Sequence, residues 1–238
     1  MPLRLNKTYC MDVLKGLRMI KDNSVDLCVT SPPYNKGYWS KNRSMTIGNG
    51  LDGRMPSKCR HIDYGVYNDT MQPDEYERWQ TEVMTEILRV LKPNGSLFYN
   101  HKDLYYNHRC VHPTWVYKFN VKQVIVWNRK NTPILAPEYF FPIHEYLFWV
   151  TKGGKVTFHR KAIDVSLQKS IWEIPPATKN SHPAPFPETL VDTCVRCCTR
   201  KGGLILDPFM GSGTTAKVAK LLGRNFIGFE LNKDYINL

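Results

Sequence analysis

Residues 203–215 read Gly203-Leu-Ile-Leu-Asp-Pro-Phe-Met-Gly-Ser-Gly-Thr-Thr215, an apolar strand followed by a glycine turn and the start of a helix. Gly211 and Gly213 allow the backbone to approach a ligand closely, and Thr214 is expected to cap the helix. The spacing lacks the third glycine of a dinucleotide-binding fingerprint and the Gly-Lys-Ser/Thr sequence of a phosphate-binding loop. The unit predicts an open α/β sheet with a ligand at the carboxyl end of this strand.

The strand expected at 225–230 adds a second cofactor signal, because it ends in Glu230. An acidic side chain in this place, downstream of the strand that ends in Asp207, can accept hydrogen bonds from both ribose hydroxyls of a nucleoside. The expected cofactor is therefore a nucleoside whose recognition does not depend on a phosphate.

The rest of the chain alternates short apolar runs with amphipathic stretches, as strands separated by helices do in an α/β sheet. The helix at 73–91 is the clearest, because its apolar residues recur at helical spacing and Lys92-Pro93-Asn94-Gly95 should stop it. With 238 residues, 42% of them apolar, we expect a single domain. The expected strands are Lys7–Met11, Val25–Thr30, Ser96–Asn100, Val121–Trp127, Tyr146–Thr151, Gly203–Asp207 and Asn225–Glu230. The expected helices are Asp12–Ile20, Pro73–Leu91, Glu188–Arg200 and Thr214–Leu222.

Two long stretches, residues 35–70 and 157–187, match no helix or strand pattern. The first mixes glycines with basic and aromatic side chains, and the second is rich in proline and lysine. Structureless segments of this length inside a compact domain are usually functional or mobile. We expect these loop insertions to be the elements that recognise the target.

The formal net charge is +12 and the pI is near 9.4, which is unusual for an enzyme of small metabolites. Nucleic acid is the favoured partner, because a polyphosphate attracts a basic surface through counterion release. The alternative is a basic surface that is merely solvated. No run approaches the roughly 20 apolar residues of a membrane span, and the first residues lack the apolar core of a signal peptide. We expect a soluble, intracellular protein.

The seven cysteines form no pairwise disulfide framework, so reduced thiols are the simpler interpretation. Cys194 and Cys197 make a lone CxxC without the second pair that a zinc site of this kind needs, and we expect no metal. Their spacing instead predicts that Cys194 and Cys197 or Cys198 join Leu190 on the buried face of a helix.

The sharpest local feature is Thr30-Ser31-Pro32-Pro33-Tyr34, where the apolar strand Val25–Thr30 ends. Ligands bind beyond the carboxyl ends of strands in an open parallel sheet, so this segment is well placed for catalysis. Two prolines fix φ and remove two N–H donors, which leaves the Ser31 hydroxyl and the Pro32 carbonyl as preorganised acceptors. The alternative is a proline-rich turn that only closes the strand.

These acceptors suit the methylation of a base amino group. Such an amine is a poor nucleophile, because its lone pair is delocalised into the ring. Two acceptors aimed at its N–H bonds would free the lone pair to attack an electrophilic methyl group. The base would have to be extruded from the duplex into the pocket, where Tyr34 could stack on it.

Residues 30–34 and 207–215 together resemble the catalytic and cofactor motifs of the DNA amino-methyltransferases of restriction-modification and related systems. The catalytic motif precedes the cofactor motif, which is the circularly permuted order of the beta subgroup of that family. Residues 6–12, 86–95 and 182–188 resemble further motifs of the family, so the resemblance spans most of the chain.

The resemblance implies the Rossmann-like fold of S-adenosylmethionine (SAM)-dependent methyltransferases, with a seven-stranded, mostly parallel sheet and helices on both faces. It implies SAM as the cofactor, with Glu230 and Asp12 at the adenosine. Catalysis would fall to Ser31, Pro32, Pro33 and Tyr34. The methionine and sulfonium side would be lined by Asp207, Phe209, Gly211, Gly213, Thr214, His182 and Phe186.

The first residue of the catalytic motif indicates the target base. In this family Ser-Pro-Pro-Tyr is the usual form in N4-cytosine enzymes, and Asp- or Asn-Pro-Pro-Tyr in N6-adenine enzymes. Ser31 therefore favours cytosine N4, with adenine N6 as the alternative, since Ser, Asn and Asp all supply an acceptor. Methylation of cytosine C5 is disfavoured, because the chain has no Pro-Cys dipeptide of that family.

Double-stranded DNA with a short recognition sequence is the expected partner, and a homodimer is consistent with beta-subgroup relatives. RNA is a second possible substrate, because its bases are often already unpaired. Two other classes are a non-catalytic nucleic-acid-binding protein on the same scaffold and a Rossmann oxidoreductase. Basic side chains that could follow phosphates or reach base edges are Lys36, Lys41, Arg43, Arg54, Lys58, Arg60, Arg129, Lys130, Lys155, Arg160, Lys161 and Lys169.

Overall fold

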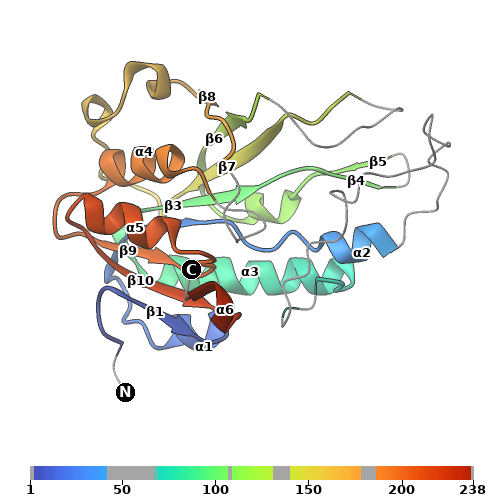
Figure 1. Cartoon of the computed structure of the whole chain (residues 1–238), viewed down its shortest axis with the longest axis horizontal. Helices are drawn as coiled ribbons and strands as arrows, with labels where there is room; N and C mark the ends of the chain where they lie inside the picture. Colours follow the sequence, from blue (N-terminus) through green and yellow to red (C-terminus); the bar gives the residue numbers. More distant parts are fainter. Residues whose placement is uncertain are drawn as a thin grey trace.

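The computed structural model describes residues 3–41, 67, 69–106, 109–130, 140–177 and 186–236. Its centre is an eight-stranded sheet in the order β1-β10-β9-β2-β3-β7-β6-β8 (Figure 1). The strands β1, β10, β9, β2 and β3 are parallel neighbours, so their carboxyl ends share one edge of the sheet. β7 is antiparallel to both β3 and β6, and β8 is parallel to β6. The bounds are β1 (Lys7–Cys10), β2 (Val25–Thr30), β3 (Leu91–His101), β6 (Val121–Asn128), β7 (His144–Val150), β8 (Ile171–Glu173), β9 (Leu204–Asp207) and β10 (Asn225–Glu230).

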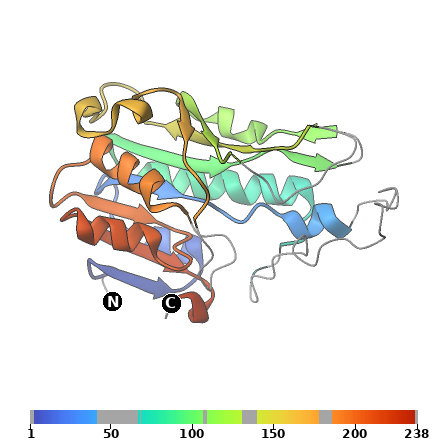
Figure 2. The same ribbon diagram turned by 45° about the horizontal axis from the view of Figure 1, so that its top comes forward.

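Helices cover both faces of this sheet (Figures 1 and 2). One hydrophobic cluster joins the sheet to α1 (Val13–Arg18) and α3 (Pro73–Val90), and the other joins it to α4 (Glu188–Cys198) and α5 (Thr214–Leu221). The α/β fold with a mostly parallel sheet between two helix layers is therefore as expected. The remaining elements are α2 (Lys36–Lys41), α6 (Lys233–Ile236), the hairpin β4 (Leu104–Tyr106) and β5 (Arg109–Val111), and the 3-10 helices η2 (Thr114–Lys118), η3 (Arg160–Ala162) and η4 (Val165–Gln168).

The expected boundaries hold where the residue pattern is strong. β2 and β10 have the predicted bounds, and α3 ends at Val90, one residue before the predicted end. The segment Lys92–Gly95 ends the helix but does not separate it from the strand, because β3 already begins at Leu91. These residues form an irregularity in β3, whose pairing with β2 shifts between Leu91 and Ser96.

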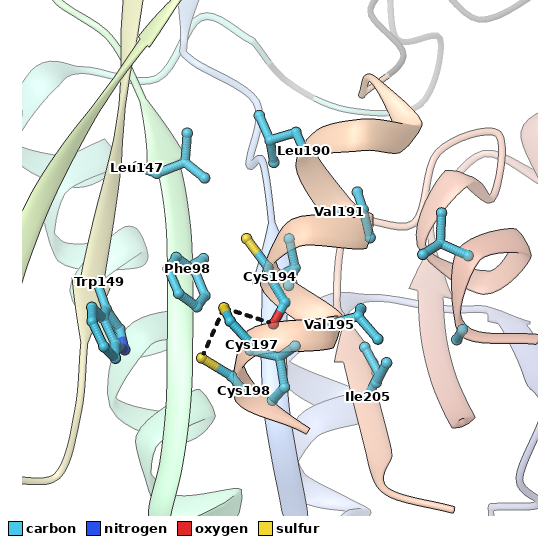
Figure 3. Packing of buried hydrophobic residues seen from close by; sticks show 14 of the residues in the cluster. Phe98, Leu147, Trp149, Leu190, Val191, Cys194, Val195, Cys197, Cys198 and Ile205 are labelled. Carbon is cyan, nitrogen blue, oxygen red and sulfur yellow. Dashed lines mark hydrogen bonds between the residues drawn. The ribbon is translucent and has the colours of Figure 1, made fainter. Parts of the chain in front are cut away.

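Helix α4 confirms the prediction for the cysteines. Leu190, Cys194, Cys197 and Cys198 are all buried, and they pack with Phe98 of β3 and neighbouring side chains (Figure 3). The thiols thus serve as small apolar groups in the core between α4 and the sheet.

The expectation that residues 157–187 hold no element was wrong, as was the count of seven strands. The segment contains η3, η4 and the eighth strand, β8, which are too short to give a clear periodicity. In β8 the buried Trp172 lies between exposed Ile171 and Glu173, and its ring joins the core cluster. α2 and the β4–β5 hairpin, which extend beyond the same end of the sheet (Figure 1), were also not predicted. Among the described residues, no helix is long and apolar enough to span a membrane.

Candidate active site

The predicted catalytic and cofactor segments meet at one edge of the sheet. β1, β10, β9 and β2 are consecutive parallel neighbours, and their ends lead into Asp12, Glu230, Asp207 and Ser31, respectively. Four segments that are far apart in sequence therefore follow one another along this edge, with the catalytic motif beside the glycine turn. This is the juxtaposition that the proposed chemistry requires.

A buried carboxylate joins the two motifs directly. Asp207 accepts hydrogen bonds from the Thr30 hydroxyl (2.8 Å), the Phe209 N–H (3.1 Å) and the Thr215 hydroxyl (2.6 Å). Burial raises the pKa of Asp207 to about 6, although all three donors favour the charged form. Thr30 immediately precedes Ser31, the first residue of the predicted catalytic motif, so this carboxylate fixes the end of β2 against the glycine turn.

The glycine turn has the backbone that its sequence predicts. Gly211 and Gly213 have φ values of 53° and 87°, in the left-handed region where a side chain is unfavourable. The expectation that Thr214 caps the helix was wrong, because Gly213 is the N-cap residue and provides no side-chain cap. The Thr214 hydroxyl instead donates to the Phe186 carbonyl (3.5 Å), which brings the segment before α4 against the turn.

The two acidic residues expected at the adenosine lie at neighbouring strand ends. Glu230 accepts hydrogen bonds from the N–H groups of Gly211 and Asn232, each at 2.8 Å, and burial raises its pKa. Asp12 accepts from the Lys15 N–H (3.0 Å) as the N-cap of α1. Each carboxylate oxygen can accept more than one hydrogen bond, so these contacts leave acceptor capacity for a ligand.

The catalytic motif forms a hydrogen-bonded group with β3 and β7. The Ser31 hydroxyl lies 2.9 Å from the Tyr34 hydroxyl and donates to Asn100 Oδ1 (3.0 Å). The Tyr34 hydroxyl lies 2.7 Å from the same Oδ1 and 3.2 Å from Glu145 Oε2. Asn100 Nδ2 donates to the Tyr146 carbonyl (3.0 Å), which fixes the amide so that its oxygen faces Ser31. When Ser31 donates its only hydrogen to Asn100, its lone pairs remain available to accept from a substrate.

A second group of hydrogen bonds fixes the Pro33 carbonyl from the side of α3. The hydroxyl of Tyr76, on α3, donates to this carbonyl (2.7 Å) and lies 2.9 Å from Gln80 Nε2 and 3.0 Å from His101 Nε2. His101 Nδ1 lies 2.9 Å from both the N–H and the carbonyl oxygen of Lys102, so these contacts fit a ring proton on either nitrogen. Burial lowers the pKa of His101 to about 3, which keeps the ring neutral. The Tyr76 hydroxyl therefore accepts from Gln80 Nε2 and gives its proton to the Pro33 carbonyl.

The Tyr34 ring is only 8% exposed, and its neighbours include the neutral His101 ring and two lysine ammonium groups. Its centroid lies 4.7 Å from that of the His101 ring, and the ammonium groups of Lys36 and Lys102 lie 5.3 Å and 5.6 Å from it. Stacking of Tyr34 on a base stays a prediction.

The remaining predicted site residues are placed as follows. Phe209 packs edge-on against Trp79 at 5.8 Å, and Phe186 packs against the core cluster below α4. His182 lies outside the described residues. The cofactor roles of all these residues stay predictions. Among the described residues, no group of three or more His, Cys, Asp or Glu side chains is arranged to hold a metal ion.

Several functional candidates were missed from the sequence, namely Asn100, Glu145, Tyr76, Gln80 and His101. Asn100 and His101 had a usable signal, because they end a strand that lies next to the catalytic strand. Glu145 had none, since it reaches the site from the start of the antiparallel β7.

The fold and the site define the chain as a Rossmann-like methyltransferase. A family model for N6 and N4 methyltransferases, described as DNA methylase, matches residues 25–238. The chain belongs to this N6/N4 DNA methylase family.

Named relatives agree with this assignment. The chain is 30% identical to the Type II methyltransferase M.BglII of Bacillus subtilis, over 98% of this chain and 68% of that protein. It is 28% identical to the Type II methyltransferase M2.DpnII of Streptococcus pneumoniae, over 95% of this chain and 85% of that protein. Both relatives are Type II methyltransferases by name, and each is matched along nearly the whole of this chain.

Solved structures share the fold. The cytosine-N4-specific PvuII DNA methyltransferase matches with a TM-score of 0.73 and 19% identity, over 97% of this chain and 83% of that chain. TTHA0409 of Thermus thermophilus, solved in complex with S-adenosyl-L-methionine, matches with a TM-score of 0.69 and 24% identity, over 98% of this chain and 90% of that chain.

Proposed function

We propose that the chain transfers a methyl group from SAM to the exocyclic amino group of an extruded base in duplex DNA, at N4 of cytosine. The observation that carries this proposal is the joined site. Ser31 presents an acceptor oxygen oriented by Asn100, and the Thr30–Asp207 hydrogen bond fixes the catalytic strand end beside the glycine turn. A methyl donor on the turn and an amino group at Ser31 would then face each other across neighbouring strand ends.

The residues at the turn fit SAM. A Cβ built on Gly213 would meet nothing within 4 Å, so there is open space beside the turn. The residues proposed for the methionine side are Asp207, Phe209, Gly211, Gly213, Thr214, Phe186 and His182, and those for the adenosine are Glu230 and Asp12. SAM supplies an electrophilic methyl group when it is bound.

On the substrate side, the protein orients the amine and excludes water. The Ser31 oxygen and the Pro32 carbonyl would accept the two amino hydrogens, which raises the nucleophilicity of the nitrogen. Two proline rings and the Tyr76 contact to Pro33 limit the freedom of the segment, so the acceptors are in position before the base arrives.

Cytosine N4 is favoured by Ser31 and by the likeness of the fold to the cytosine-N4-specific PvuII enzyme. Adenine N6 is the second candidate, because the family model covers both reactions.

The net charge of +12 supports DNA as the substrate, and the segments 35–70 and 157–187 are the candidates for target recognition. Within the second segment, residues 157–162 lie beside Asn94 and the end of α4, at the opposite edge of the sheet, whereas β8 is parallel to β6 and therefore runs in the direction of β3, toward the catalytic edge. We place the enzyme in the cytoplasm, where it has access to DNA.

The test is the identity of the product. Purified protein is incubated with duplex DNA and isotopically labelled SAM, and the digested nucleosides are identified by mass spectrometry. We expect N4-methylcytosine. N6-methyladenine would select the second candidate, and 5-methylcytosine, labelled RNA alone or no product would refute the proposal. The Gly211→Asp variant serves as the control, because it should lack cofactor binding.

A further inference from the structure

Two lysines from different elements converge on the catalytic tyrosine. Lys36 begins α2, two residues after Tyr34, and Lys102 follows the end of β3. Their ammonium nitrogens lie 5.3 Å and 5.6 Å from the centroid of the Tyr34 ring, and both side chains are half-buried. Two half-buried lysines at one tyrosine differ from the solvated lysines of a basic surface, because it costs free energy to hold two like charges side by side and partly removed from water.

The carboxylates near these lysines have other partners. Glu145, on β7, pairs with Arg129 at 2.8 Å and accepts from the Tyr34 hydroxyl at 3.2 Å. Asp69, just before α3, accepts from the Gly37 N–H at 2.9 Å. Among the residues that the structure describes, the neighbourhood therefore holds three cationic side chains and two carboxylates that are already hydrogen-bonded. An additional anion would balance the charge.

The electrostatics of Lys36 reflect this imbalance. Burial and the repulsion of Lys102 and Arg129 lower the pKa of Lys36 to about 7, against the attraction of Glu145 and Asp69. Burial also lowers the pKa of Lys102. Near neutral pH the free enzyme can lose one of its two ammonium charges, because two adjacent cations repel.

We propose that Lys36 and Lys102 form an anion-binding site that holds a backbone phosphate of the extruded target nucleotide. The inference rests on the proposed function, which brings the base to Ser31 and Tyr34 and so its own phosphates close to the same residues. A phosphate is a strong acceptor, and two ammonium groups can satisfy two of its oxygens. The site would anchor the extruded nucleotide by its backbone, independently of the base.

The proposal predicts that DNA binding takes up a proton. At pH 8 Lys36 is mostly uncharged in the free enzyme, and a bound phosphate restores its charge by raising its pKa. Calorimetric titration of the protein with a short duplex, in two buffers of different ionisation enthalpy, measures this uptake. We expect uptake of a substantial fraction of one proton for the wild type and almost none for Lys36→Met. Lys102→Met should shift the uptake to higher pH, because the repulsion is gone.

Salt dependence gives a second measurement. Each neutralised phosphate contributes about 0.9 to the slope of log affinity against log salt, so each variant should lower the slope by no more than about 1, because both lysines hold the same phosphate. Lys152→Met is the matched control, because Lys152 is exposed and hydrogen-bonded to Asn23, at the opposite edge of the sheet. Its slope and proton uptake should equal those of the wild type. Thermal midpoints verify that all three variants are folded.

Three outcomes would overturn the site. The first is undiminished proton uptake when DNA binds to Lys36→Met. The second is proton uptake when SAM binds without DNA, which would assign the anion to the carboxylate of the cofactor. The third is unchanged uptake when the phosphates flanking the target base are replaced by neutral methylphosphonates. Absence of any methylated product from the wild type would instead refute the proposed function, so the two failures are distinguishable.

Discussion

Removing the hydroxyl of Tyr76 tests whether α3 holds the catalytic loop in place. The side chain is 3% exposed, and its hydroxyl has three hydrogen-bond partners, Pro33, Gln80 and His101. Tyr76→Phe keeps the ring and its packing, so only these bonds are lost. The matched control is Tyr99→Phe, because the Tyr99 hydroxyl donates to Gln80 Oε1 (2.8 Å) at the far end of the same group and does not touch Pro33.

The structure sets the size of both effects. A buried hydrogen bond contributes about 1 kcal/mol, and a buried group left without a partner costs about 1–3 kcal/mol. Tyr76→Phe leaves Pro33 with only a long contact to Gln80 at 3.4 Å, so we expect a loss of roughly 2–4 kcal/mol of stability. Tyr99→Phe breaks one bond and should cost about 1–2 kcal/mol. A catalytic loop displaced by a fraction of an ångström should lower kcat by about tenfold to a hundredfold in Tyr76→Phe alone.

Steady-state methyl transfer and chemical denaturation measure these quantities separately. In Tyr76→Phe kcat should fall while the affinity for SAM stays within about twofold, because the cofactor turn follows β9 and does not contact Tyr76. Tyr99→Phe should lose stability with kcat changed by less than about threefold. If the two variants have the same kcat, Tyr76 contributes only to stability and the positioning argument fails.

Three further predictions concern the turn, the catalytic tyrosine and the buried carboxylate. Gly211→Asp should abolish SAM binding in calorimetry, since it strains a residue at φ 53° and places a second carboxylate beside Glu230; near-normal affinity would refute this. Tyr34→Ala should lower turnover far more than SAM affinity, and equal losses would contradict the assigned roles. Asp207 has a folded pKa of about 6, above its ordinary value of 3.8, so it contributes stability below pH 4 that is lost as the pH rises through 6, by about 3 kcal/mol. The difference in the free energy of unfolding between wild type and Asp207→Asn should therefore change by this amount between pH 4 and pH 7.5 in urea denaturation. A constant difference would refute the raised pKa of Asp207.

The segments that could be predicted from the sequence are those whose conformation is determined by their own residues. The turn at Gly211 and Gly213 requires positive φ, and the sequence has glycine at both positions. The run Val25–Thr30 is buried on both faces except at the half-buried Asp26, as befits a central parallel strand, and its bounds were predicted without error. Because a parallel sheet aligns its carboxyl ends, these two local features also predicted that Ser31 would lie beside the cofactor turn.

The rest depended on information that no local pattern contains. The apolar run of β7 predicts a strand but not its direction, and only the antiparallel pairing with β3 brings Glu145 to Tyr34. In the sequence, Tyr76 is one of the residues that recur at helical spacing in 73–91, and its ring is buried as that pattern predicts. Its hydroxyl has a role only because α3 packs beneath Pro33, which is a tertiary contact.

The acidic identity of Asp207 follows from its surroundings. All three groups that contact it, the hydroxyls of Thr30 and Thr215 and the N–H of Phe209, are donors. An amide in the same place would turn its NH2 group towards one of them, whereas a carboxylate accepts from all three at once. Burial of the charge costs about 3 kcal/mol at neutral pH, judged from the raised pKa. The carboxylate offsets this cost by holding the ends of β2 and β9 in one geometry, and a methyl transfer between two loops needs that distance to be fixed.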